Sequence, residues 1–159
     1  MVQSLQALTG QAVTKSTHFY GESATATSLA LKRPVLPGYL LRSYQRLAEL
    51  AALQEDWDSY GALPISEKAL DGARRLLSRV CRELPSAADA SPFALAPLAN
   101  GGVQIEWRGA HGALELEVDP KGRLSGLLVG DHETGRSYEE RSRLSMTVAT
   151  RLVSRTLGL

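Results

Sequence analysis

Two histidines and two carboxylates could supply metal-site or acid–base chemistry. A predicted sheet brings the turn at His111 and the run Asp131, His132, Glu133 to the same end of two hairpins. Neutral imidazoles and carboxylates bind zinc and other divalent cations, and an imidazole beside a carboxylate can transfer protons. Their spacing matches no standard ligand motif. A small metal-dependent hydrolase built on these four residues is therefore kept as an alternative.

The sequence lacks the local motifs that mark a catalytic nucleophile, a phosphate-binding loop or a dinucleotide site. It contains no GxSxG, no Walker A sequence, no HExxH and no GxGxxG after a strand. The single cysteine, Cys81, falls on the apolar stripe of a predicted helix, where we expect a buried and inert thiol. We assign no catalytic residue and no cofactor, and a role without enzymatic turnover is favoured.

One face of the predicted sheet mixes carboxylates with apolar side chains. The alternation of apolar residues in two adjacent strands places Glu106 directly opposite Glu115, and the next register puts Leu127 and Val129 on the same face. Like charges directly opposite each other destabilise a sheet. The glutamates are therefore solvated, face a basic partner, or form a metal or acid–base pair. The apolar residues need a cover, which is the N-terminal segment, the last helix or another copy of the chain.

Two aromatic residues, Trp57 and Tyr60, lie in a turn-rich segment between two predicted helices. We expect Trp57 to close the open end of the helix hairpin, Asp58 to cap a turn, and Gly61 to take a positive backbone angle. The alternative is an exposed aromatic anchor at a protein interface.

The C-terminal residues are rich in arginine. Ser137 and Glu140 have the spacing of a capping box, which predicts the start of the last helix. On that helix Arg143, Thr147 and Arg151 share one face. Such a stripe suits nucleic-acid phosphates, an acidic partner, or the glutamates of the chain's own sheet. With a sequence pI of about 7.9, nucleic-acid binding is an alternative and is not favoured.

The hydrophobic pattern predicts an α+β fold, because the strands are grouped and do not alternate with helices. Apolar residues at helical spacing over 40–53 and 70–84 predict a helix hairpin, with Ser66 as the N-cap of the second helix. Period-two alternation over 93–129 predicts a four-stranded antiparallel meander, and one helix follows it.

Residues 1–36 differ in composition from the rest of the chain. They are rich in Ser and Thr, show no sustained periodicity and carry few formal charges. We expect residues 1–36 to be an N-terminal arm, partly extended, that docks on the domain or on a partner chain. Residues 37–159 then form a single α+β domain.

The overall composition is that of a globular domain. The chain has 159 residues, of which 43% are hydrophobic, and 18 Lys and Arg against 17 Asp and Glu. One cysteine excludes an internal disulfide framework and suits a reducing compartment. No stretch approaches the roughly 18 apolar residues of a membrane helix, and no signal peptide is recognisable. We expect a cytoplasmic protein that makes no membrane contact.

Two short motifs carry a family resemblance. Residues 57–62 read WDSYGA, Pro-Ile-Ser follows at 64–66, and residues 101–107 read GGVQIEW. Together they resemble a family of small bacterial proteins that typically read WDGYGA and GGVQLEW at these places. The resemblance covers about residues 40–130 and departs from the family at Ser59 and Ile105. It implies a bacterial origin, a shared fold and a link to phage or other mobile DNA, and it implies no catalytic residues.

The combined expectation is a recognition module without turnover. It would be a bacterial or phage accessory protein, such as an inhibitor or antitoxin-like partner, that binds another protein or a second copy of itself. The residues expected to contact the partner are Trp57, Tyr60, Glu106, Glu115, Leu127, Val129, Arg143 and Arg151.

Overall fold

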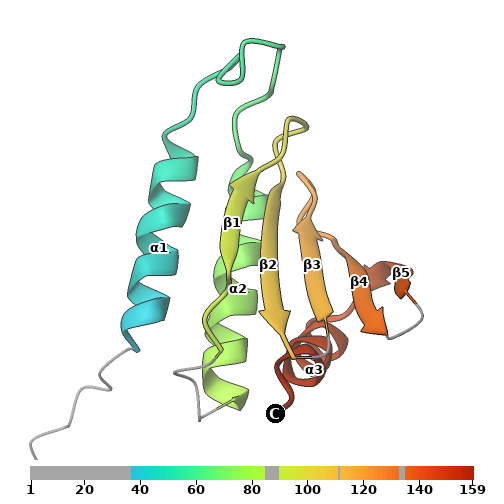
Figure 1. The fold of residues 1–159 in the computed structure, drawn as a ribbon. Helices are drawn as coiled ribbons and strands as arrows, with labels where there is room; N and C mark the ends of the chain where they lie inside the picture. The colour runs from blue at the N-terminus through green and yellow to red at the C-terminus, as the bar shows by residue number, and fades with distance from the viewer. Residues whose placement is uncertain (1–36, 85–89, 111, 133–134) are drawn as a thin grey trace, which may run out of the picture. The chain divides into compact units, whose positions relative to one another are not determined.

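The computed structural model describes residues 37–84, 90–110, 112–132 and 135–159. Their elements, in chain order, are α1 (Gly38–Ala51), α2 (Glu67–Glu83), β1 (Ala94–Pro97), β2 (Val103–Gly109), β3 (Gly112–Val118), β4 (Leu124–His132), β5 (Gly135–Leu144) and α3 (Met146–Leu157). The strands form one antiparallel sheet in the order β1-β2-β3-β4-β5 (Figure 1). The predicted α+β class is confirmed. The arm predicted over 1–36 lies outside the described residues.

The sheet has five strands, so the prediction of four is wrong. The difference lies where Ser137 and Glu140 predicted a helix start, because the structure has β5 there. Helix α3 begins later, with Ser145 as its N-cap. Before Leu144 the β5 sequence offers no apolar residue at helical spacing. Pairing with a β4 strand that extends to His132 therefore outweighs the local capping signal.

Helices α1 and α2 form the predicted hairpin, and Ser66 caps α2 as predicted. Its hydroxyl oxygen accepts a hydrogen bond from the Ala69 amide at 3.1 Å and donates to the Pro120 carbonyl at 2.9 Å. Its own amide donates to the Gly101 carbonyl at 3.0 Å. One residue therefore joins the start of α2 to the turn before β2 and to the turn between β3 and β4.

That second turn is held by Asp119. Its Oδ1 atom accepts hydrogen bonds from the backbone amides of Lys121 and Arg123 at 2.9 and 2.8 Å, and its Oδ2 atom accepts from Arg123 Nε at 2.6 Å. Burial favours the neutral acid, but the hydrogen bonds from Arg123 and Lys121 outweigh it and lower the pKa of the Asp119 carboxyl. The ionised carboxylate is thus part of the turn.

The core lies between the inner face of the sheet and helices α2 and α3, and buried side chains of α1 complete it. In β2 and β3 the predicted register is confirmed, and its apolar pairs are fully buried: Val103 with Val118, Ile105 with Leu116, and Trp107 with Leu114. The Trp107 indole donates to the Ala90 carbonyl at 3.1 Å. Helix α2 packs directly on β3, since a Cβ at Gly72 would lie 2.6 Å from a Val118 methyl carbon.

The two edges of the sheet differ. Strand β1 has four residues, ends at Pro97 and contacts α1, from which Arg46 Nε donates to the Leu95 carbonyl at 3.3 Å. Strand β5 has ten residues, contains no proline, and presents mostly exposed side chains. No described strand pairs with its outer edge. The chain thus protects the β1 edge and leaves the β5 edge open within the described residues.

Candidate functional site

The outer face of the sheet, opposite the helices, brings the predicted acidic and apolar residues together. Glu106 lies directly opposite Glu115, Glu115 opposite Leu127, and Leu127 opposite Glu140. The predicted pairing of the two glutamates is confirmed. Glu140, expected in a helix cap, instead completes a row that crosses four strands and places carboxylates on both sides of one leucine.

A second row lies beside the first and is less polar. Ala113, Val129 and Tyr138 face one another across β3, β4 and β5. Val129 is half-buried, whereas the Tyr138 side chain is 66% exposed. We call the six larger side chains of these two rows the outer-face patch: Glu106, Glu115, Leu127, Val129, Tyr138 and Glu140.

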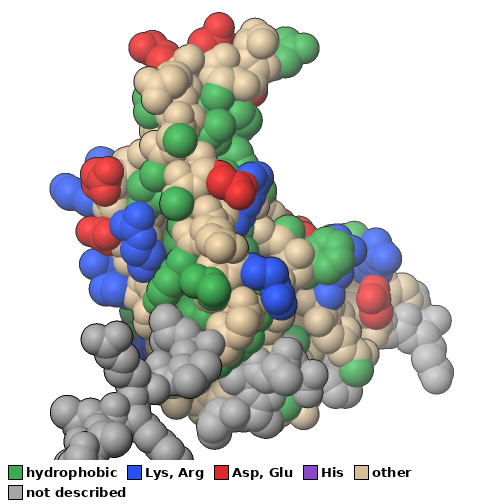
Figure 2. Space-filling model, turned by 90° about the vertical axis from the view of Figure 1, so that its left-hand side faces the viewer, with side chains coloured by type: hydrophobic (Ala, Val, Ile, Leu, Met, Phe, Trp, Pro, Cys, Tyr) green, Lys and Arg blue, Asp and Glu red, His purple; other side chains and the backbone are tan. Residues whose placement is uncertain are grey.

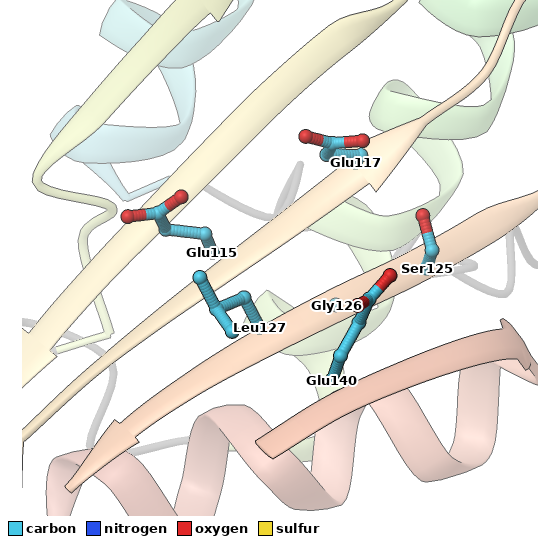
Figure 3. Close-up of a pocket in the computed structure, with 6 residues that line it drawn as sticks. All are labelled: Glu115, Glu117, Ser125, Gly126, Leu127 and Glu140. Carbon is cyan, nitrogen blue, oxygen red and sulfur yellow. The ribbon is translucent and has the colours of Figure 1, made fainter. Parts of the chain in front are cut away.

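The outer-face patch is concave. A hollow of about 190 Å³ lies over β3 and β4, and Figure 3 shows its side chains standing on one side of the sheet around Leu127: Glu115, Glu117, Ser125 and Glu140. A wider hollow of about 500 Å³ adjoins it toward Val129 and Tyr138. Glu115 and Leu127 line both hollows.

The carboxylates of the patch differ in their partners. Glu106 pairs with Arg108 at 2.6 Å, and the Arg108 guanidinium stacks 3.5 Å from the centre of the Phe93 ring. Glu115 accepts a hydrogen bond from the neutral Gln104 amide at 2.9 Å. Within the described part of the chain, neither Glu115 nor Glu140 pairs with a cation. The patch therefore attracts positive charge and offers an apolar floor between the carboxylates.

The described helices leave the outer face uncovered. In Figure 1 the sheet lies in front of α2 and α3, and both helices pack on its inner face. The last helix, one of three predicted covers, is therefore on the opposite side, and that expectation is wrong. The other two predicted covers are the arm, residues 1–36, and a second copy of the chain. Both lie outside what the structure describes.

The loop between α1 and α2 is held by hydrogen bonds of its own. Trp57 is half-buried and its indole donates to the Leu63 carbonyl at 3.1 Å. The Asp58 carboxylate accepts from two backbone amides of the loop, and Gly61 has a φ of 86°. The expected roles of Asp58 and Gly61 are confirmed. Tyr60 differs from Trp57, because its side chain is 93% exposed.

The tip of this loop carries negative charge. Residues 52–66 include Glu55, Asp56 and Asp58 and contain no Lys or Arg. Figure 2 shows acidic and hydrophobic side chains at the upper end of that view, whereas side chains of both signs are interspersed lower down. Tyr60 stays a candidate contact residue on this loop.

The arginine stripe predicted on the last helix is wrong. Arg143 lies in β5, one residue before its end, with a φ of 55°, whereas Arg151 is exposed on α3. The helix begins three residues after Arg143, so the two arginines do not share a helix face. Arg151 and Arg155 remain four residues apart on the exposed side of α3.

The predicted metal or acid–base group is largely outside the described residues. His111 and Glu133 are among those not described, and for His132 only the backbone at the end of β4 is described. The Asp131 carboxylate pairs with Arg136 Nε at 3.0 Å. No group of three His, Cys, Asp or Glu residues able to hold a metal ion occurs in the described ranges.

Sequence reasoning missed the contribution of β5 to the site. Tyr138 and Glu140 lie on the outer face together with Arg136, which lines the wider hollow. Their neighbours Ser137, Glu139 and Arg141 are polar as well, so the sequence has no apolar alternation that would mark a strand here. The capping-box pattern at the same positions predicted a helix start instead.

Two further findings concern membrane crossing and similarity to known proteins. None of the helices in the described ranges combines the length and apolar character that a membrane crossing requires. Comparison with family models, with curated proteins and with solved structures finds no match to this chain.

Proposed function

We propose that this protein is a non-enzymatic recognition module whose outer-face patch binds a basic protein segment carrying an apolar side chain. The observation that supports it is the row of carboxylates around Leu127 on a sheet face that the described helices leave uncovered. Apolar side chains rimmed by charge on an open face are typical of interaction sites.

The charges of the row favour a cationic partner. Directly opposed glutamates such as Glu106 and Glu115 repel each other, and the Arg108 pair offsets only one of them. Lysine or arginine side chains of a partner would relieve the repulsion at Glu115. Burial of Leu127 would add an apolar contribution, while the negative field would steer the encounter.

The same proposal places the protein in a bacterium or a phage. The resemblance of residues 57–66 and 101–107 to small bacterial proteins supports a bacterial or phage accessory protein, such as an inhibitor or antitoxin-like partner, and the single cysteine suits the cytoplasm. Its partner would then be a basic bacterial protein.

The test uses two synthetic peptides and the full chain labelled with ¹⁵N. In one peptide lysine alternates with leucine, and in the other glutamate replaces lysine. We expect the lysine peptide to shift the amide resonances of β3, β4 and β5, with an affinity that falls as NaCl rises from about 50 to about 500 mM. The glutamate peptide should produce no such shifts.

Matched variants locate the binding surface. Glu115→Gln and Leu127→Ser should each weaken binding of the lysine peptide by about 5-fold or more, because each removes a central contact. The controls are Glu67→Gln and Leu41→Ser, which change an acidic and an exposed apolar side chain on the helices. Shifts confined to other elements, or equal losses in test and control variants, would refute the proposal.

A further inference from the structure

The open edge of β5 contains a regular run of seven residues. Residues 135–141 pair with β4 without interruption, from His132 opposite Gly135 to Gly126 opposite Arg141. Beyond Arg141 the register shifts, and Arg143 takes a positive φ before Leu144 pairs with Leu124. Tyr138 is the central residue of the run. An open edge of this length normally pairs with another strand or is blocked by a protective device.

The side chains of the run are complementary to themselves. Its outer-face positions are Arg136, Tyr138 and Glu140. If a second copy pairs antiparallel about a two-fold axis at Tyr138, Arg136 of each copy lies opposite Glu140 of the other. Tyr138 then lies opposite its own counterpart, and Ser137 lies opposite Glu139 on the other face.

The same charges disfavour other symmetric registers. A two-fold axis keeps each residue on its own face, so the pairing can move only in steps of two residues. One such step places Glu139 opposite itself, which is repulsive. Either step reduces the paired run from seven residues to five and separates Arg136 from Glu140. Charged side chains usually prevent an exposed edge from pairing, but on β5 they favour the one register centred on Tyr138.

The existing contacts of these side chains leave room for the new pairs. Glu140 has no cationic partner among the described residues, so Arg136 of a second copy would supply one. Arg136 already pairs with Asp131, but both side chains are more than 60% exposed, and a guanidinium has five N–H donors. The largely exposed Tyr138 would become buried against its counterpart.

We propose that the protein forms a two-fold dimer in which the β5 strands pair edge to edge around Tyr138. The two five-stranded sheets then form one continuous sheet. Because the axis is perpendicular to the sheet, both outer faces lie on the same side and both sets of helices on the other. The dimer goes beyond the proposed function and does not depend on it, since peptide binding is measured separately from association.

A charge-swap cycle tests the dimer by sedimentation equilibrium of the full chain over about 1–100 µM. We expect Arg136→Glu and Glu140→Arg each to weaken dimerisation by about 30-fold, since two attractive pairs become repulsive. The double variant Arg136→Glu/Glu140→Arg restores both pairs and should return the dissociation constant to within about 3-fold of the wild type. Arg75→Glu, an exposed change on α2, is the matched control and should have no effect. Far-UV circular dichroism confirms folding.

A crosslink tests the register. In a Cys81→Ala background, Tyr138→Cys should give a disulfide-linked or short-bismaleimide-linked dimer, because the two cysteines face each other across the axis. Ser142→Cys is the control, since its two copies would lie about 26 Å apart in this register. The proposal is overturned by a wild-type protein that stays monomeric, by a dimer that Arg136→Glu does not weaken, or by equal crosslinking of both cysteine variants.

Discussion

Replacing Trp107 with phenylalanine should reduce the free energy of unfolding by about 3 kcal/mol. Trp107 is fully buried between the sheet and the helices, and its indole donates to the Ala90 carbonyl at 3.1 Å. Ala90 is also fully buried, so the carbonyl left without a donor gains no contact with water. The substitution therefore removes packing atoms and a hydrogen bond at the same place.

The magnitude is the sum of two contributions. A buried carbonyl left unsatisfied costs about 1–2 kcal/mol, and truncating a packed aromatic ring with incomplete relaxation costs about 1–2 kcal/mol more. Because a domain is stabilised by only about 5–15 kcal/mol in total, this loss is readily measured. With a urea m-value near 2 kcal/mol/M, the midpoint should fall by about 1.5 M.

The other tryptophan provides a matched control. Trp57 also donates to a backbone carbonyl at 3.1 Å, but its acceptor belongs to Leu63, which is 51% exposed. Trp57→Phe should therefore cost about 1 kcal/mol or less, since water can replace the lost donor. Both variants are compared by urea unfolding followed at 222 nm. A Trp107→Phe cost below about 1 kcal/mol, or one no larger than that of Trp57→Phe, would refute the argument.

Two further predictions concern pH. Asp119→Ala should lower the free energy of unfolding by about 1–2 kcal/mol at pH 7, and this cost should shrink below about pH 4. The pKa of Asp119 is lowered in the folded chain, so its stabilisation is present above the unfolded pKa and is lost as the carboxylate is protonated. Urea titrations at acid and neutral pH check this, and a cost independent of pH would contradict it. Burial, followed by the neighbouring Cys81 thiol, raises the pKa of the Tyr39 phenol, so wild-type stability should fall as pH rises above about 10, where the unfolded chain releases a proton that the folded chain retains. Tyr39→Phe should reduce that alkaline loss in thermal unfolding at pH 9 and 11, and an unchanged loss would show that Tyr39 does not cause it.

The features predictable from the sequence are those in which local pattern and tertiary packing agree. The alternation over 103–107 and 114–118 has one register that buries every apolar residue, so the pairing of Glu106 with Glu115 followed from it. Ser66 has a side chain that can cap a helix, and apolar residues at helical spacing follow it, so this N-cap was also predictable. The core, the helix hairpin and four of the six residues of the outer-face patch were predictable for these reasons.

The rest could not be predicted because β5 has no buried face. Its side chains are nearly all exposed, so no apolar alternation distinguished strand from helix over 135–144. The pairing partner, β4, decides its conformation. Because a helix start was predicted where β5 lies, Arg143 was wrongly assigned to a helix, and the contribution of Tyr138 and Glu140 to the outer face was not predicted. The positive φ of Arg143 has no strong sequence signal either, since arginine rarely takes that angle.

Three of the hydrogen bonds of Ser66, those of its hydroxyl and its amide, bear on how the molecule opens. The first turn of an isolated helix frays readily, because its amides have no partners within the helix. Here that turn is linked to Gly101 and Pro120, residues far away along the chain. The Ser66 and Ala69 amides should therefore exchange with solvent more slowly than the first-turn amides of an isolated helix, because their release requires the turns at this end of the sheet to open.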